Sequence, residues 1–295
     1  MAKIEHLALL QQGALQWKEW RSANSSIQPD LSQADLSRMD LSGFDLSHAN
    51  LREANLWEAQ LVGTDLTGAM LQKVNLSHAN LTDAILNQAE LAHAMLAWAD
   101  LTGAELCDTR LIGADLRRVS LREANLCRAN LVGTEIWGVN LQEADLCGAD
   151  LRRTNLSRAV LIAANLSDAN CDRTNFYQAE LNQAHLYCTV LHGANLQEAN
   201  CTGAYLYNAD LSEAILSEAN FSWANLTQAN LTQAELRATN LRGAKLRRAD
   251  LSKADLTDAN LRGADLNKAN LTATILTNAE LSDTNLRQPL PEKIT

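Results

Sequence analysis

Residues 246–266 read LRRADLSKADLTDANLRGADL, in which Leu returns at every fifth position. The same spacing runs without insertion from Leu31 to Leu286. We call the leucine position i. The residue at i−2 is small, mostly Ala with some Thr, and the residue at i−1 is usually Asn or Asp. Leucine is replaced at position i only by Ile136, Cys171, Phe176, Cys201 and Phe221.

A five-residue period fits neither an α-helix nor a flat strand. On an α-helix five residues advance the side chain by about 500°, so the leucines would point in all directions. On a flat strand they would alternate between the two faces. They share one side only if the chain turns a corner once per repeat, with positions i−2 and i inward. Every Gly of the repeat region occupies i+2, the third residue of a turn that begins at i, where a type II turn has positive φ.

A second period sets the number of sides. Residues of one kind recur at multiples of 20, or four repeats, in two sets: Cys107, Cys127 and Cys147, and Trp57, Trp137 and Tyr177. Four repeats per coil predict an all-β solenoid of about 13 coils, which rises ~4.8 Å per coil to a rod of roughly 60 Å. Each coil is expected to form backbone hydrogen bonds with the next coil.

The triplets Ala-Asp-Leu at 34–36, Ala-Asn-Leu at 124–126 and Ala-Asp-Leu at 264–266 match A(D/N)LXX, the motif of the pentapeptide repeat family. The chain resembles this family over residues 31–286. The resemblance implies a right-handed quadrilateral β-helix. It implies little about function, because members share an architecture and seldom share a site.

The N-terminal segment, residues 1–24, breaks the pattern and predicts an α-helical cap over the first coil. Gly13 is expected to divide it into two short helices. A helix that binds a membrane surface or a partner is the alternative. Its apolar residues fall three or four apart, as on one helical stripe: Ile4, Leu7, Leu10, Ala14, Trp17 and Trp20.

Residues 25–30 are expected to connect the cap to the β-helix at 31–286, and residues 287–295 form a C-terminal tail. Pro289 and Pro291 cannot extend a ladder of backbone hydrogen bonds. Either Leu290 covers the last coil, or that end is an open edge that a second copy would cover. The chain is therefore expected to be a monomer or an end-to-end dimer.

Composition predicts a cytoplasmic protein without a cofactor. The net charge of −10 disfavours direct nucleic-acid binding. The sequence shows no signal-peptide pattern and no apolar run of about 18 residues, so we expect no membrane segment. Cys171 and Cys201 occupy core positions, which fits a reduced compartment. The narrow core leaves no room for a cofactor.

No catalytic or metal-binding motif is recognisable, so we predict that the protein is not an enzyme. The repeat itself explains the many carboxylates at i−1. No Ser or Cys lies in a nucleophile motif, and no glycine-rich phosphate loop is present. The histidines have unrelated phases and no metal-ligand spacing: His6, His48, His78, His93, His185 and His192.

Two groups of outward residues are candidate contact surfaces. The first combines aromatic and arginine side chains, the types enriched at protein–protein hot spots. Isolated aromatics on a β surface, or stacking of single-stranded nucleic acid, are the alternatives. This candidate partner surface comprises Trp57, His78, Met95, Trp98, Arg117, Arg118, Trp137, Arg158 and Tyr177.

The second group is a small apolar patch around one corner, and neutral drift on a tolerant surface explains it equally well. A ladder of cysteines gives poor disulfide geometry and diverges from any point where a metal would bind. The patch comprises Cys107, Ile112, Cys127, Val132 and Cys147. A basic stretch at 237–268 is interpreted as a solvated face, with an anionic docking site as the alternative.

These observations favour a non-enzymatic scaffold that binds an unidentified protein partner. The resemblance implies a regulatory role, since similar proteins with a helical cap are common in cyanobacteria and some influence differentiation. The alternative is a DNA mimic that binds DNA gyrase, as some acidic family members do. This chain departs from those members because they favour Phe at the centre of the repeat, where this chain has mostly Leu, and because it has a basic end.

Overall fold

The computed structural model describes residues 2–285 of the chain. Leu286, the predicted tail at 287–295 and the expected cover by Leu290 lie outside the described residues. The chain divides into two compact units, Met1–Asp145 and Leu146–Thr295. We refer to them as unit 1 and unit 2.

Unit 1 begins with two helices, α1 (Ile4–Gln11) and α2 (Ala14–Ala23). They are separated at Gly13, as the sequence predicts, and Gly13 has a φ of 105° that favours glycine. The predicted single apolar stripe is only partly correct. Leu10 and Trp17 are buried, whereas Ile4 is exposed, because the break at Gly13 gives each helix its own buried face.

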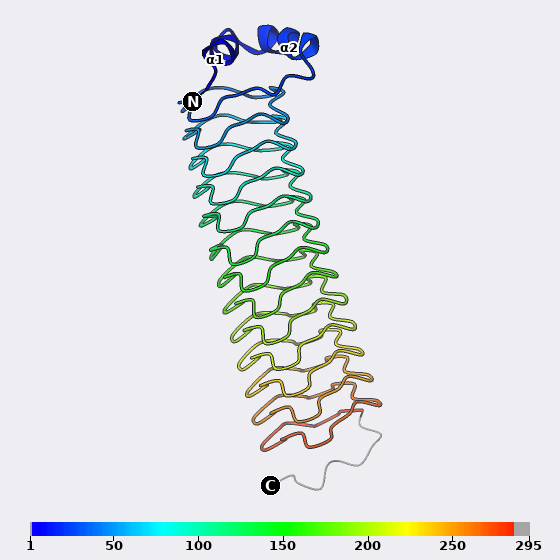
Figure 1. The fold of residues 1–295 in the computed structure, drawn as a ribbon. Coiled ribbons are helices and arrows are strands. Elements are labelled where there is room, and N and C mark those ends of the chain that lie inside the picture. Colours follow the sequence, from blue (N-terminus) through cyan, green and yellow to red (C-terminus); the bar gives the residue numbers. More distant parts are fainter. Residues whose placement is uncertain (1, 286–295) are drawn as a thin grey trace. The chain divides into compact units, whose positions relative to one another are not determined.

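The second helix contacts the coil beside it through polar groups. The indole Nε1 of Trp17 donates a hydrogen bond of 2.7 Å to the backbone carbonyl of Asp45. The Arg21 guanidinium donates to both carboxylate oxygens of Asp45 and to the Ser47 hydroxyl. In Figure 1, α1 and α2 lie beyond the N-terminal coils of unit 1, drawn in blue.

The repeats of both units are joined by parallel β-bridges, each a single residue long. In unit 1 the residue at i−1 pairs with the residue 20 positions later, as in the series Asp35, Asn55 and Asn75. In unit 2 Asn175 pairs with Asn195 in the same way. Within each unit one coil therefore takes 20 residues, as the sequence predicts, and the coils stack as Figure 1 shows. Among the described residues this gives a quadrilateral β-helix with no strand longer than one bridge.

Each repeat turns at a four-residue corner closed by a hydrogen bond from i+3 to i. The amide of Ala34, for example, donates to the carbonyl of Leu31 at 3.1 Å. Every residue at i+2 from Gln33 to Asp283 has a φ between 53° and 69°. Glycine is therefore preferred there and not required. No β-branched residue occupies i+2, since a branched Cβ is strongly disfavoured at positive φ.

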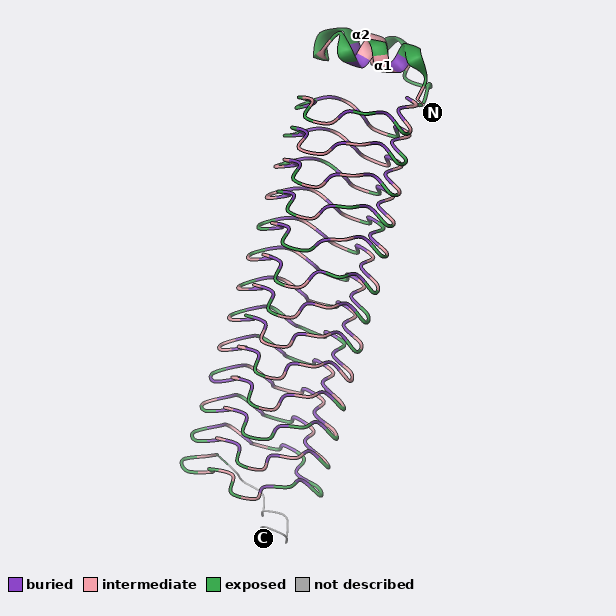
Figure 2. Cartoon of the chain, turned by 90° about the vertical axis from the view of Figure 1, so that its left-hand side faces the viewer, coloured by how far each residue is buried: buried purple, intermediate pink, exposed green. Residues whose placement is uncertain are grey.

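The core consists of the side chains at i and i−2. Leucines such as Leu56 and alanines such as Ala59 are 0% exposed, and Figure 2 shows buried and exposed residues alternating around the coils. Where Thr replaces Ala at i−2, its hydroxyl donates a hydrogen bond to a backbone carbonyl. Thr189 Oγ1, for example, donates to the Leu166 carbonyl at 2.7 Å. The buried hydroxyl is thus satisfied without disturbing the core.

The Asn and Asp residues at i−1 hold the corners. Asp45 Oδ1 accepts a hydrogen bond from the Ser47 amide at 3.0 Å, an Asx turn repeated at many corners. Asn side chains also donate along the stack, as Asn75 Nδ2 does to Asn55 Oδ1 at 3.1 Å. The structure thus assigns these carboxylates and amides to the backbone of the repeat.

Candidate functional site

The predicted partner surface has seven of its nine residues in unit 1. Backbone hydrogen bonds place them on successive coils of one side: Arg38 donates to the Trp57 carbonyl, and Trp98 donates to the Arg117 carbonyl at 3.2 Å. The corner geometry explains why side chains meet between coils. Residues at i+2 share one backbone conformation, so equivalent side chains 20 residues apart stand side by side.

Four of these residues form a continuous stack, which we call the aromatic–arginine ladder: His78, Trp98, Arg118 and Trp137. The rings of His78 and Trp98 are parallel within 4° with centroids 6.2 Å apart. The Arg118 guanidinium carbon lies 4.7 Å from the centre of the Trp98 ring and 5.7 Å from that of Trp137. Trp98 remains 53% exposed, so much of its surface is available for contact.

Trp57 belongs to a separate pair. The Arg38 guanidinium lies 4.5 Å from the centre of its ring, and Arg38 also forms an ion pair with Glu58 at 2.9 Å. Arg38 was not among the residues predicted from the sequence. It could have been identified because it precedes Trp57 by 19 residues, the spacing that the backbone hydrogen bonds impose between coils.

Arg117 and Arg118 differ in whether their charge is already paired within the protein. Arg117 forms two hydrogen bonds of 2.7 Å with Asp115, and this contact holds the pKa of the Asp115 carboxyl below its usual value. Among the described residues no carboxylate lies within ion-pair distance of Arg118, which faces only aromatic rings. Arg118 is therefore the cation of the ladder that can meet an incoming group.

Two shallow cavities flank the ladder. One of about 450 Å³ is lined by Trp98, Arg118 and Trp137 with neighbouring backbone. The other, of about 380 Å³, lies between Arg117 and Trp137. Met95 is 46% exposed beside them on the coil of Trp98. The surface thus combines aromatic rings, one available cation and two hollows.

Arg158 and Tyr177 belong to unit 2 and form their own polar contacts. Arg158 Nε donates to Gln178 Oε1 at 3.0 Å. The Tyr177 hydroxyl donates to Glu198 Oε1 at 3.1 Å, and this bond raises the pKa of Tyr177.

The second predicted patch is divided in the same way. Cys107, Ile112, Cys127 and Val132 are half-buried residues of unit 1, and Cys147 belongs to unit 2. Asp108 donates to the Cys127 carbonyl, which places Cys107 and Cys127 on neighbouring coils. Burial, together with Glu105, raises the pKa of the Cys107 thiol. Thiolate chemistry is therefore disfavoured there.

The structure also brings together residues that sequence reasoning missed. In unit 2 the His185 ring lies edge-on to Tyr187 and Tyr205, and those two tyrosines have centroids 6.0 Å apart. Trp223 is 63% exposed and lies over Gly243 on the next coil. The spacing of 20 residues could have revealed both contacts.

Other features of the described residues bear on function. Ion pairs engage Arg237, Arg247 and Arg262 of the basic stretch with aspartates, which fits a solvated face. Residues 2–285 contain no cluster of three or more His, Cys, Asp or Glu that could hold a metal ion. Neither described helix has the length and hydrophobicity needed to cross a membrane.

Comparison with known proteins matches eight copies of the pentapeptide repeat along the chain. The matched residues are 30–68, 69–106, 109–146, 140–176, 174–213, 194–233, 214–253 and 254–288. A comparison with curated proteins finds no significant match.

Several solved structures are similar to the chain. HetL, a pentapeptide repeat protein involved in heterocyst differentiation regulation from the cyanobacterium Nostoc sp. strain PCC 7120, is 31% identical, with 90% of this chain and 96% of HetL covered and a TM-score of 0.37. Rfr23 from the cyanobacterium Cyanothece 51142 is 43% identical over 30% of this chain and 62% of Rfr23, with a TM-score of 0.30. QnrB1, a plasmid-mediated fluoroquinolone resistance protein, is 23% identical over 57% of this chain and 84% of that chain, with a TM-score of 0.37. The eight repeat matches, which together run from residue 30 to residue 288, show that this chain belongs to the pentapeptide repeat family.

Proposed function

We propose that the chain is a non-enzymatic scaffold that binds a protein partner through the aromatic–arginine ladder. The observation that carries this proposal is the exposed Trp98 held between His78 and Arg118. Stacking on both sides pre-orders the indole, so little conformational entropy is lost when a partner covers it. Trp and Arg are the side chains that contribute most at protein interfaces.

The partner would present complementary groups to this surface. Arg118 favours a carboxylate or a further aromatic ring, and the hollows beside Trp137 favour apolar side chains. A regulatory role is proposed by analogy with HetL, which is described as involved in heterocyst differentiation regulation. We also propose that the repeats form a β-helix of about 13 coils and that α1 and α2 cap its N-terminal end. The protein would act in the cytoplasm.

Comparing two exposed tryptophans tests this function. Trp98 and Trp223 both occupy i+2 with similar φ, 65° and 63°, so replacing either with Ala places the new residue in the same backbone conformation. Wild-type protein, Trp98→Ala and Trp223→Ala are used to capture partners from a lysate of the source organism. A protein retained by wild type and Trp223→Ala but lost with Trp98→Ala is expected. An identical set of captured proteins from all three would contradict the proposal.

A DNA mimic that binds gyrase is a second candidate, which the net charge of −10 favours. A gyrase supercoiling assay distinguishes the two. Inhibition of gyrase, or its protection from a quinolone, would support the mimic. If supercoiling by gyrase is unchanged when the protein is in excess, the DNA-mimic hypothesis is rejected and the scaffold proposal remains.

A further inference from the structure

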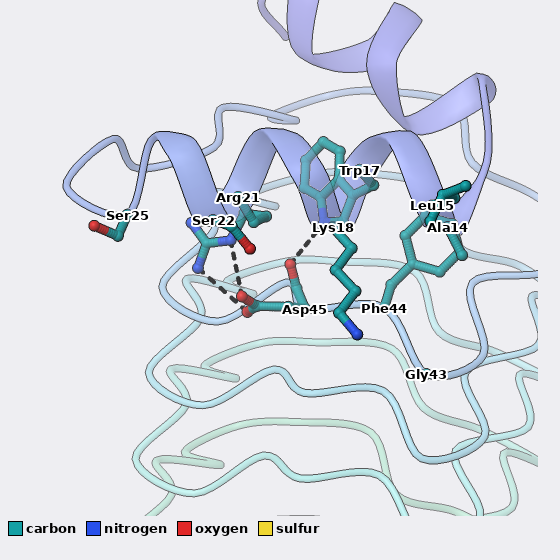
Figure 3. A pocket seen from close by; sticks show the side chains of 10 residues that line it. All are labelled: Ala14, Leu15, Trp17, Lys18, Arg21, Ser22, Ser25, Gly43, Phe44 and Asp45. Carbon is teal, nitrogen blue, oxygen red and sulfur yellow. Dashed lines mark hydrogen bonds and ion pairs between the residues drawn. The ribbon is translucent and has the colours of Figure 1, made fainter.

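A cavity of about 640 Å³ lies between α2 and the coil that contains Gly43, Phe44 and Asp45. All of its lining residues belong to unit 1. Figure 3 shows its two ends: Leu15 and Phe44 lie at one end, Arg21 lies at the other, and Lys18 reaches down between them. The volume falls within the range of about 300–1,000 Å³ that small-molecule sites usually have.

The apolar end has a preformed wall. Trp17 is 1% exposed and its ring centroid lies 6.5 Å from that of Phe44. Leu15 is 64% exposed at the rim of the cavity. An apolar body of a few carbons placed here would cover Leu15 and the small part of Phe44 that remains exposed, since Phe44 is 6% exposed.

The lining of the cavity carries a net positive charge. The Arg21 side chain is only 10% exposed and is committed to Asp45 and Ser47. Among the described residues, no carboxylate lies within ion-pair distance of the Lys18 ammonium. Arg21 and Asp45 offset each other, so Lys18 leaves the cavity with a net charge near +1.

A glycine keeps the cavity open. Gly43 lines it, and a Cβ built on Gly43 would meet no atom within 4 Å. Its φ of 69° is one that other residues adopt throughout the repeats, as Gln33 does at 60°. A larger residue at position 43 would therefore fit the backbone and occupy the space that a ligand needs.

We propose that this cavity binds a small amphipathic carboxylate, with the carboxylate at Lys18 and a compact apolar body against Leu15 and Phe44. A cationic ligand is disfavoured by Lys18 and Arg21, and a neutral one gains no charge-assisted hydrogen bond from the exposed Lys18 ammonium. Bound ligand touches both α2 and the coil beneath it. Ligand binding is therefore expected to stabilise α2 on that coil, a small-molecule response separate from the aromatic–arginine ladder.

Phenylacetate is the probe, with phenylacetamide and phenethylamine as neutral and cationic analogues of similar shape. Each is titrated into the full-length protein while backbone amide signals are followed by NMR. Phenylacetate should shift amides of residues 14–23 and 43–45 in a saturable manner. It should bind at least about tenfold more tightly than either analogue, because a charge-assisted hydrogen bond distinguishes it.

Two variants and one control locate the site. Gly43→Gln should reduce phenylacetate affinity by about tenfold or more, because the side chain fills the cavity. Gly63→Gln is the matched control, since Gly63 lies one coil further with a φ of 60° and also has open space around its Cβ. Lys18→Gln should weaken phenylacetate by about tenfold and leave phenylacetamide unchanged.

Any of three results would overturn the proposal. The first is that phenylacetate at millimolar concentration leaves the amides of residues 14–23 and 43–45 unshifted. The second is that the cationic analogue binds as tightly as phenylacetate. The third is that Gly63→Gln weakens binding as much as Gly43→Gln does.

Discussion

The guanidinium of Arg21 forms two hydrogen bonds with the carboxylate of Asp45, from Nε to Oδ2 at 3.0 Å and from Nη2 to Oδ1 at 3.2 Å. Arg21 also donates to the backbone carbonyl and the hydroxyl of Ser47. These contacts join α2 to the coil beside it. Arg21→Ala should lower the free energy of local opening of α2 by about 2 kcal/mol. Hydrogen–deuterium exchange of residues 14–23 measures this loss, and unchanged protection would contradict the role given to Arg21.

The same contact predicts a pH dependence. Burial of the Asp45 carboxyl works to raise its pKa, but hydrogen bonds from Arg21 and Ser47 outweigh burial and lower the pKa. A carboxylate with a lowered pKa stabilises the fold above its unfolded-state pKa, and this stabilisation is lost as pH falls through the folded-state pKa. Protection of residues 14–23 should therefore fall below about pH 4. Asp45→Asn is the control, because its protection should be lower at neutral pH and change less with acid.

The core contains a small and a large side chain one coil apart in unit 2. Cys201 and Phe221 are buried at equivalent positions, and the Cys201 amide donates to the Asn220 carbonyl on the next coil. Cys201→Leu alone should overpack the column and cost about 1–3 kcal/mol. Phe221→Leu alone should leave a void and cost about 1 kcal/mol. The double variant restores the usual leucines and should be close to wild type in denaturant unfolding. Additive losses would show that the two volumes are independent.

A glycine and a tryptophan are coupled in unit 2. A Cβ added at Gly243 would overlap Cε3 and Cζ3 of Trp223, whereas one added at Gly263 would meet no atom within 4 Å. The two glycines have φ of 66° and 69°, so backbone strain is matched. Gly243→Ala should displace the Trp223 ring and cost about 1 kcal/mol more than Gly263→Ala. Thermal unfolding measures the difference, which should disappear when Trp223 is also replaced by Ala.

The corner position i+2 should reject β-branched residues. Gln88 is exposed with a φ of 61°. Gln88→Val should destabilise the protein by about 1–2 kcal/mol, because a branched Cβ is strained at positive φ. Gln88→Gly should be neutral or stabilising. Ser77→Val at the neighbouring position i+1 is the control. Equal stability of both valine variants would refute the explanation for the absence of Val, Ile and Thr at i+2.

Much of the fold follows from the sequence because each structural position of the repeat is filled mainly by one residue type. Leucine at i and alanine at i−2 fix the inward side, and the glycines mark the corner where φ is positive. The 20-residue coil within each unit could be read from Cys107 and Cys127, which the structure places on neighbouring coils. The sequence did not predict that each side of a coil in residues 2–285 would hold only a single bridge residue and no longer strand.

The candidate surface was only partly predictable. Trp57 and Trp137 share a phase, but Ser77, Ala97 and Arg117 occupy the coils between them and provide no ring to connect them. The ladder instead runs mainly through i+2, where His78, Trp98 and Arg118 are consecutive. Spacing identifies neighbours, while contact depends on side-chain length and direction. The cavity beside Gly43 was not predicted, because it depends on how α2 is seated on the coil.

The shared conformation at i+2 has a consequence for redesign. His78, Trp98 and Arg118 have φ of 61°, 65° and 58°, values that recur at every corner of the described repeats. The ladder proposed as the contact surface therefore lies mainly at positions whose backbone conformation is the same at every described corner. Moving the four ladder residues by 20 positions, which is one coil, should move the partner-binding surface by one coil. The leucines of the core should be unaffected.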